Sequence, residues 1–362
     1  MGARTRGLAN NVLSSGKLDA TDAVSGVISA SNIADASLTS ATSFGSVTGG
    51  VPAVASDPPS PAEGDIWYNT TSGQIKFVAQ AGTWASGGNL NTARQGLGGV
   101  GLQTAALGFG GDTNHPANAK ATFTESYNGS AWTELNDLNT GRGFIGCVGT
   151  TTAALACGGT TQSFPPFATA LTESFDGSTW TEVNDLNTFR AAAASSSQSP
   201  NTAALYISGT YAGPAATSVN NVESYNGTSW TEITDTSSNK NFGVGFGTQT
   251  DVLAVANTTS ELWNGSSWTE VAELNTSRSH GGNAGSSTIA LYIGGFIDPP
   301  QSANVEAYNG TTWTEVADIS EARRGIGGAG TQTAALGFGG SPPGLSASTE
   351  EWTFSATTTI VG

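Results

Sequence analysis

The chain has 362 residues, 49 of them Gly, and its 12 Lys and Arg against 28 Asp and Glu give a formal net charge of −16 at pH 7. This charge opposes non-specific attraction to phosphate backbones, and no apolar run approaches the roughly 18 residues of a membrane-spanning helix, so nucleic-acid binding and membrane insertion are disfavoured. With two cysteines and two histidines, the chain offers neither a disulfide framework nor a Cys/His zinc site, and we expect no metal and no cofactor.

Residues 1–60 are predicted to form an extended arm rather than a domain. They contain no Trp or Tyr and one Phe, which is too little apolar bulk for an independent core. Ile, Val and Leu alternate with small residues over 26–38, a pattern that favours strand pairing with another chain, such as a second copy of this one. The run 57–61 is predicted to be a stiff proline-rich linker, and no secretion or myristoylation signal opens the chain. We therefore expect a protein made in a cytoplasm and anchored or oligomerised through residues 1–60.

Residues 61–84 are predicted to hold a β-hairpin and the start of one further strand. The hairpin is the run Pro61-Ala-Glu-Gly-Asp-Ile-Trp-Tyr-Asn-Thr-Thr-Ser-Gly-Gln-Ile-Lys-Phe77. It resembles the Gly-Asp-Ile/Leu-Trp-Tyr-Asn hairpin of phage tail fibres and other virion proteins. The resemblance is confined to this short run and implies a structural protein of a bacteriophage particle. The further strand, 82–86, contains Trp84.

Residues 85–362 are built from internal repeats, which indicate an array of similar units. One block, Glu-Ser-Tyr-Asn-Gly-Ser-Ala-Trp-Thr-Glu, occurs with small changes five times, at 125–134, 173–182, 223–232, 261–270 and 306–315. Each copy has a strand ending in an aromatic residue, an Asn-Gly or Asp-Gly turn, and a second strand beginning at Trp. The block predicts a hairpin, in which Asn and Gly serve the positive φ of a turn rather than a glycosylation site.

A second hairpin precedes each block. In the clearest copy it runs from Arg142 through a Thr-rich turn near 152 to the doublet Gly158-Gly159, which suits close backbone approach near a crowded axis. Two hairpins make one four-stranded sheet. A basic residue before strand one, a glycine doublet after strand two, then an aromatic residue and a spaced Trp resemble the kelch repeat, whose period is about 50 residues. The resemblance implies an all-β fold, a kelch-like β-propeller over residues 85–362.

The number of predicted blades is six. Basic residues open six first strands, and third strands are expected near 123, 171, 221, 260, 304 and 348. The last unit lacks its own fourth strand, whereas 82–86 is a fourth strand without a unit. Pairing of these N- and C-terminal strands would close the ring and remove an exposed sheet edge. An alternative stays open, since 74–78 competes with 348–354 for the third-strand position of the closing blade.

Six basic residues are the candidate ligand-binding site. They hold the same position before the first strand of successive units, so a propeller would place them in a ring: Arg94, Arg142, Arg190, Lys240, Arg278 and Arg323. By the kelch resemblance, residues at this position can line the channel mouth and bind a carboxylate or an anionic sugar. The alternative, which we favour, is that each pairs with a repeated acid such as Glu125, Glu134 or Asp137.

The remaining side chains with distinctive chemistry are expected to serve the fold. Repeated Trp and Tyr residues are expected to pack between sheets rather than form a sugar-stacking platform. Cys147 and Cys157 lie opposite each other if their hairpin turns near 152, and we expect free buried thiols. No nucleophile accompanies His115 or His280, so we expect no enzyme, although two loop carboxylates would be enough for a glycosidase.

The predicted function is that of a phage virion structural protein, synthesised in the host cytoplasm and located in the virion. It would display a propeller for host-surface attachment or for decoration of the head or tail. The expected partners are other virion proteins through residues 1–60, further copies of this chain, and a host-surface glycan or receptor. Two alternatives remain: a carbohydrate-binding, lectin-like propeller, and a kelch adaptor that binds acidic partners.

Overall fold

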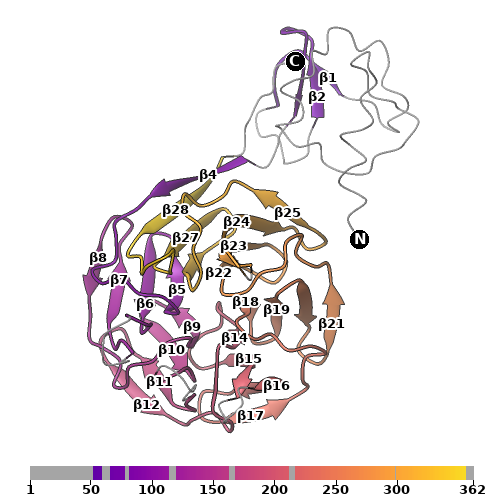
Figure 1. The fold of residues 1–362 in the computed structure, drawn as a ribbon. Helices are drawn as coiled ribbons and strands as arrows, with labels where there is room; N and C mark the ends of the chain where they lie inside the picture. The colour runs from indigo at the N-terminus through magenta and orange to yellow at the C-terminus, as the bar shows by residue number, and fades with distance from the viewer. Residues whose placement is uncertain are drawn as a thin grey trace. The chain divides into compact units, whose positions relative to one another are not determined.

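The computed structural model describes residues 52–58, 66–77, 81–113, 120–162, 168–211, 217–297 and 299–355. The chain divides into two compact units, one formed by 1–81 with 355–362 and the other by 82–354 (Figure 1). The predicted arm therefore lies outside the described residues up to position 51, and the predicted segment 61–84 is divided at residue 81.

The smaller unit contains a three-stranded sheet. Its strands are β1 (Ala53–Val54), β2 (Ile66–Asn69) and β3 (Gln74–Phe77); β1 runs parallel to β2, and β2 antiparallel to β3. The strands of the predicted hairpin are thus confirmed.

The sheet is fastened by a single carboxylate, that of Asp57, which the sequence had placed in a linker. Asp57 accepts hydrogen bonds from Trp67 Nε1 at 3.0 Å, Asn69 Nδ2 at 2.7 Å and Lys76 Nζ at 2.6 Å. The bond from Lys76, followed by those from Asn69 and Trp67, lowers the pKa of Asp57 to about 2. Position 57 therefore lies in the segment after β1, and its side chain is bonded to the small sheet.

The larger unit consists of small antiparallel sheets, six within the described residues, and no helix occurs there. The first comprises β5 (Gly98–Leu102), β6 (Ala105–Phe109), β7 (Thr124–Tyr127) and β8 (Trp132–Glu134). The second comprises β9 (Gly146–Thr150), β10 (Ala153–Cys157), β11 (Thr172–Phe175) and β12 (Trp180–Val183). The third comprises β13 (Arg190–Ala191), β14 (Ala194–Ser195), β15 (Ala204–Tyr211), β16 (Thr217–Tyr225) and β17 (Trp230–Ile233).

The other three sheets repeat this order of strands. The fourth comprises β18 (Val244–Thr248), β19 (Asp251–Ala256), β20 (Thr259–Trp263) and β21 (Trp268–Val271). The fifth comprises β22 (Gly282–Gly285), β23 (Ala290–Phe296), β24 (Gln301–Tyr308) and β25 (Trp313–Val316). The sixth comprises β26 (Gly327–Gly330), β27 (Ala334–Phe338), β28 (Thr349–Ser355) and β4 (Ala81–Ser86).

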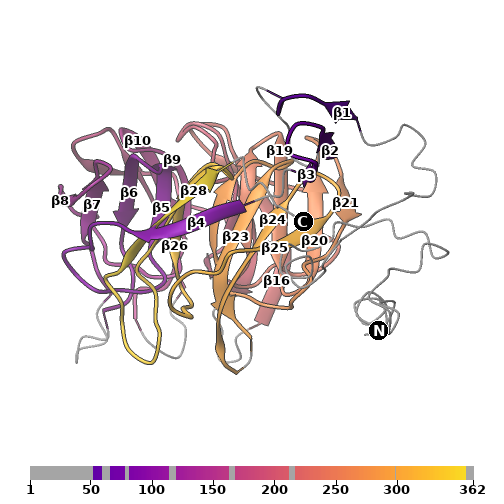
Figure 2. The same ribbon diagram turned by 90° about the horizontal axis from the view of Figure 1, so that it is seen from above.

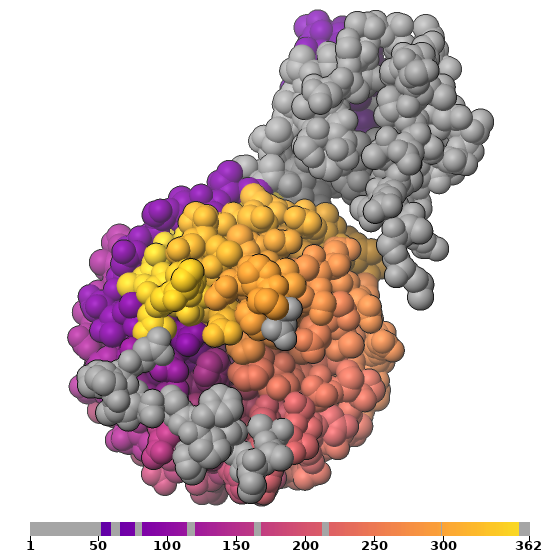
Figure 3. Space-filling model, viewed as in Figure 1, coloured from indigo at the N-terminus to yellow at the C-terminus, as the bar shows by residue number. Residues whose placement is uncertain are grey.

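The sheets surround a common centre, each with its first strand innermost (Figure 1). The inner strands contact one another in the order β5, β9, β14, β18, β22, β26 and again β5. Figure 2 shows the same sheets from a perpendicular direction. In the space-filling view the chain colour passes around the larger unit in order, so that its first and last parts meet (Figure 3). This all-β architecture is consistent with a multi-bladed β-propeller.

The strand order decides between the two segments that competed for the last sheet. β28 lies between β27 and β4, whereas β3 pairs with β2 in the smaller unit. The ring centroids of Trp352 in β28 and Trp84 in β4 are 5.4 Å apart. The corresponding aromatic pairs of the other five sheets are 5.0–5.2 Å apart. Residues 349–355 therefore hold the third-strand position.

The cysteine prediction needs one correction. The hairpin of β9 and β10 turns on Thr151 and Thr152, so Cys147 pairs with Ala156 and not with Cys157. The thiols consequently lie one position out of register, and both are free, as expected. Burial raises the pKa of each thiol.

The hairpin loops also differ in detail from the expectation. In the loop 128–131, positive φ occurs at Gly129, at 92°, and Asn128 keeps negative φ. The Asn128 side chain instead accepts the N–H groups of Ser130 and Ala131 at 3.0 and 2.9 Å. Asn thus closes the loop through its side-chain oxygen, as an Asx turn does, while Gly supplies the unusual backbone conformation.

Close approach at the centre explains the small side chains of the inner strands. The second residues of the inner strands are Gly99, Cys147, Ser195, Gly245, Asn283 and Gly328. A Cβ on Gly245 would lie 2.2 Å from the carbonyl oxygen of Ser195, and one on Gly328 would lie 2.3 Å from that of Asn283. Neighbouring backbones therefore leave no space for a methyl group at Gly245 and Gly328.

Gly245→Ala is expected to destabilise the larger unit by about 1–3 kcal/mol, because the added methyl overlaps backbone that cannot rotate away. Gly344→Ala is the matched control, since a Cβ at Gly344 meets nothing within 4 Å. Urea unfolding followed by Trp fluorescence measures both variants. Equal stability of the two would contradict the packing described at the centre.

Candidate functional site

The six predicted basic residues are all buried, with at most 1% of their surface exposed. Each forms an ion pair with the glutamate on the third strand of its own sheet. The pairs are Arg94 with Glu125, Arg142 with Glu173 (2.9 Å), Arg190 with Glu223 (2.6 Å), Lys240 with Glu261 (2.7 Å), Arg278 with Glu306 (2.5 Å) and Arg323 with Glu350 (2.6 Å). One charged pair therefore lies inside each sheet.

The other oxygen of each glutamate fastens the loop that arrives from the preceding sheet. It accepts a backbone N–H at 2.7–2.8 Å from Asn91, Asn139, Asn187, Ser237, Asn275 and Ser320, respectively. The arginines also donate to main-chain carbonyls; Arg142 Nη1 reaches those of Gly158 and Leu171 at 3.0 and 2.6 Å. Each pair thus joins a loop, a first strand and a third strand.

Burial has the expected electrostatic effect on these cations. Loss of hydration lowers the pKa of Arg94, Arg142 and Lys240, and the neighbouring glutamate charge opposes that shift. For Glu261, burial raises the pKa, but the bonds from Lys240 and from the backbone of Ser237 outweigh it, and the pKa is lowered overall. The carboxylate therefore stays ionised beside its cation.

The geometry favours the structural interpretation of the basic ring. A ligand carboxylate could reach these cations only by displacing a buried glutamate. Of the acids named from the sequence, Glu125 is the partner, whereas Glu134 and Asp137 are exposed and pair with no basic residue of the ring. Asp137 instead accepts the backbone N–H of Thr124 at 3.2 Å.

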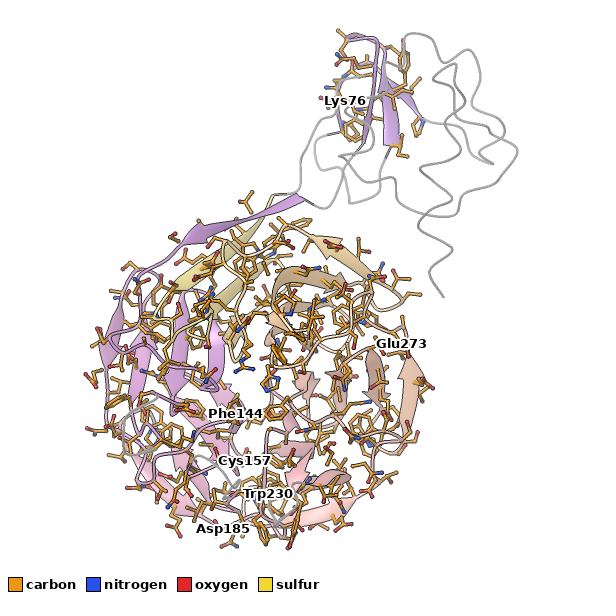
Figure 4. The ribbon with its side chains drawn as sticks, in the orientation of Figure 1. Lys76, Phe144, Cys157, Asp185, Trp230 and Glu273 are labelled. Atoms are coloured by element: carbon orange, nitrogen blue, oxygen red, sulfur yellow. The ribbon has the colours of Figure 1, made fainter. Side chains whose placement is uncertain are left out.

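The repeated tryptophans also serve packing. Trp132, Trp180, Trp230 and Trp313 are 5–6% exposed. Trp180 illustrates the contact: its ring lies 5.0 Å from Phe175 in its own sheet and 4.9 Å from Phe109 in the preceding one, and its Nε1 donates to Thr124 Oγ1 of that sheet at 3.0 Å. Figure 4 places Trp230 far from the centre of the ring. These rings join adjacent sheets and offer little surface to a sugar.

The centre of the ring is formed by a different set of residues, which lie two positions after the basic ones. Each has φ between 52° and 65°, and each donates its backbone N–H to the carbonyl of its counterpart in the preceding sheet at 2.6–3.0 Å. The bonds form a closed cycle through Gly96, Phe144, Ala192, Phe242, His280 and Gly325. Figure 4 shows Phe144 near the centre.

A pocket of about 80 Å³ opens on this cycle, and we call it the axial mouth. Its walls include the six residues of the cycle with Leu97, Ile145 and Ile326. Three rings gather there: His280 stacks on Phe242 with centroids 3.8 Å apart, and Phe144 meets both edge-on at 5.5 and 6.1 Å. The sequence did not single out the two Phe residues. Their signal was a departure from the repeat, because Gly or Ala occupies the same position in three other sheets.

His280 is neutral in this setting. Burial, and then the positive charge of Arg324, lower its pKa to about 3. Its Nδ1 lies 2.8 Å from Ser279 Oγ. Its neighbours at the axial mouth are aromatic rings, and no carboxylate lies in hydrogen-bonding distance of its ring among the described residues, so the Ser279–His280 contact lacks the acid that would complete a triad. His115 lies outside the described residues.

A second cavity, of about 320 Å³, is lined by the ends of the inner strands beyond their close approach. Its walls carry glycines, small apolar residues and the uncharged polar residues Thr150, Thr151, Ser197, Gln198 and Asn283. Asn283 and Ser197 already donate to the carbonyl of Gly245, at 2.8 and 3.1 Å.

Within the described ranges, no three His, Cys, Asp or Glu side chains are placed to hold a metal ion. No helix in that part of the chain has the length and apolar character to cross a bilayer. No protein-family model matches the chain, and no curated protein is significantly similar to it.

Arg142→Met is expected to lower the free energy of unfolding by about 3–5 kcal/mol, because it leaves the Glu173 carboxylate buried without its cation. The double variant Arg142→Met, Glu173→Met should recover part of the loss, since no uncompensated charge remains. Arg324→Gln is the control and should change stability by about 0.5 kcal/mol or less, as it removes no ion pair. Urea unfolding measures all three. If Arg142→Met is as stable as Arg324→Gln, the structural role of the ion pair is refuted.

The lowered pKa of His280 predicts that the free energy of unfolding depends on pH. Its pKa is about 3 when folded and near 6.5 when unfolded, so below pH 6.5 the unfolded chain binds a proton that the folded chain does not. The contribution of His280 to the free energy of unfolding should be fully present above pH 6.5. It should fall as the pH drops toward 5, by at most about 1.4 kcal/mol per pH unit. His280→Gln should show a smaller slope over pH 7 to 5 in urea unfolding. Identical slopes would show that His280 is not shielded from protonation.

Proposed function

We propose that this chain is a bacteriophage virion structural protein that displays a six-bladed, kelch-like β-propeller for host-surface attachment or for decoration of the head or tail. In this proposal residues 1–60 anchor the chain to other virion proteins or join copies of it. The observation that carries the proposal is that the repeated basic residues, their third-strand glutamates and the repeated tryptophans are used to hold the sheets together. Such a unit is a rigid scaffold on which unrepeated residues provide recognition.

Six-fold closure is supported by two independent features. The cycle of backbone hydrogen bonds visits each of the six sheets once and returns to its start. The sixth sheet is completed by β4, the first strand of the larger unit, so that the two ends of the unit lie in one sheet. A ring closed in this way leaves only short sheet edges that could pair with other chains. This suits a module exposed outside a cell.

The kelch-like assignment is supported by the role of each marker residue. The basic residue pairs with the third-strand glutamate, the doublets such as Gly158-Gly159 both take positive φ, and the Trp packs on the preceding sheet. The repeated carboxylates are used in the same way in each sheet. A differentiated acid and base, as a hydrolase needs, would have to come from unrepeated positions, which favours a non-catalytic role.

The virion assignment is supported by the hairpin 61–77. Its two strands form a sheet in a unit separate from the propeller. A separate N-terminal unit suits a protein that is held at one end and presents a folded domain at the other. The location in the virion follows from this proposal.

A lectin-like role is favoured by one specific observation. Phe189 is 38% exposed, and its ring lies 4.6 Å from that of Tyr211. The corresponding position in the other sheets is Ala, Gly, Asn or Ser, so this aromatic pair has no part in the repeated packing. Exposed aromatic faces suit stacking on the apolar face of a sugar ring. A glycan receptor would unite this role with host attachment.

Deletion of residues 1–51, which leaves β1 and Asp57 of the smaller unit in place, tests the anchoring role. Particles released by cells that carry the gene are purified by density gradient, and the chain is detected in them by immunoblot and immunogold electron microscopy. We expect the full chain in particles and the truncated chain, still folded by circular dichroism, in the soluble fraction only. Particles that lack the full chain, or that retain the truncated one, would contradict the proposal.

A further inference from the structure

Arg324 differs from the other basic residues of the chain. Among the Lys and Arg side chains of the described ranges, it alone belongs to no ion pair. Its Nε is shielded from solvent and has no hydrogen-bond partner, as is also true of Arg94, Arg142, Arg190 and Arg323, so the missing ion pair is what distinguishes Arg324. In a chain with a net charge of −16, a guanidinium without a carboxylate is conspicuous, because a partly desolvated cation is stabilised by an anion beside it.

Arg324 stands beside the axial mouth. The next residue, Gly325, belongs to the hydrogen-bonded cycle, and the charge of Arg324 acts on His280 of the mouth. The guanidinium carbon lies 4.8 Å from the centre of the Phe296 ring, which in turn lies 6.1 Å from that of His280. An unpaired cation and several aromatic rings therefore share one small region.

None of these groups follows the repeat. The position after the basic residue is Gln, Gly, Ala, Asn or Ser in the other sheets, and Arg in the sixth only. The rings of Phe144, Phe242 and His280 likewise occur in three sheets of six. The fold requires only a positive φ and a backbone N–H at these positions, which Gly96, Ala192 and Gly325 supply without a ring.

We propose that the axial mouth binds an acidic sugar, with Arg324 paired to its carboxylate and the rings of Phe242, His280 and Phe144 in contact with the sugar. This inference deepens the proposed display function and rests on it only for the biological source of the sugar. A planar guanidinium holds a carboxylate through two parallel hydrogen bonds, and aromatic rings suit the C–H face of a pyranose. The pocket admits one small group, and the sugar ring lies at its rim.

The overall negative charge does not prevent this binding. At 0.1 M salt the interaction between exposed charges is screened beyond about 10 Å. Near the mouth, Arg324 carries a charge that no carboxylate pairs, and His280 is neutral. One unpaired cation matches a ligand with one carboxylate per unit, as in a uronic acid, better than an acidic peptide with several adjacent charges.

Calorimetric titration of the full chain with glucuronate, glucose and acetate tests the proposal. Glucuronate should bind about tenfold or more tightly than either of the others, because only it offers both the carboxylate and the ring. Binding of acetate equal to that of glucuronate would remove the role of the sugar. Equal binding of glucose would remove that of Arg324, and no binding of glucuronate would overturn the proposal.

Two variants locate the site. Arg324→Gln should weaken glucuronate binding by about tenfold or more, and Phe242→Ala should weaken glucuronate binding but not acetate binding. Lys76→Gln removes the same charge from the smaller unit and should leave the affinity unchanged. Undiminished binding by Arg324→Gln overturns the assignment, and its thermal unfolding checks that the variant is folded.

A further measurement separates this inference from the display function. Arg324→Gln chains should enter particles as the unaltered chain does, since the proposed anchor is residues 1–60. Normal incorporation with lost glucuronate binding supports both proposals. Normal incorporation with unchanged binding overturns only the sugar site, and absence of the unaltered chain from particles overturns only the display function.

Discussion

The fold of the larger unit depends on a charged pair buried in each of its sheets. A buried cation is costly unless it is paired and its remaining donors are satisfied. The third-strand glutamate supplies the opposite charge, and nearby carbonyls accept most of the other donors, although one guanidinium nitrogen of each arginine keeps no partner. The second carboxylate oxygen holds the incoming loop. Two residues after each basic residue, the chain adopts positive φ, and its backbone N–H bonds to the preceding sheet at the centre. The ion pair and the closed cycle are thus parts of one local structure, repeated around the ring.

A division of labour between repeated and unrepeated residues follows from this construction. Residues that recur in every sheet have partners within the fold: the basic residue has its glutamate, and the tryptophan has the preceding sheet. Residues that break the pattern, such as Phe189 and Arg324, contact other unrepeated residues, Tyr211 and Phe296, and take no part in the repeated pairs. In a symmetric scaffold, chemistry particular to this protein is therefore concentrated where the repeat is broken.

The close approach of the inner strands limits where a ligand can bind. Gly99, Gly245 and Gly328 bring neighbouring backbones so near that a methyl group would not fit between them. Of the cavities described above, one is lined by aromatic residues and lies near Arg324, and the other is lined by glycine, small apolar residues and uncharged polar groups. The two cavities thus differ in chemistry although the sheets around them are alike.

The sequence alone determined the features that repeat: the hairpins, the positions of the strands near 123, 171, 221, 260, 304 and 348, and the alternative that each basic residue pairs with an acid. Local hydrogen bonding and packing fix such features, so a pattern within one repeat reveals them. Only the tertiary structure decided which acid is the partner, that β28 rather than β3 joins β4, that Asp57 bonds to a sheet, and that Phe144, Phe242, His280 and Arg324 lie together. Those outcomes depend on contacts between residues at least 10 positions apart, up to the 268 that separate Trp84 from Trp352, and no local pattern encodes such contacts.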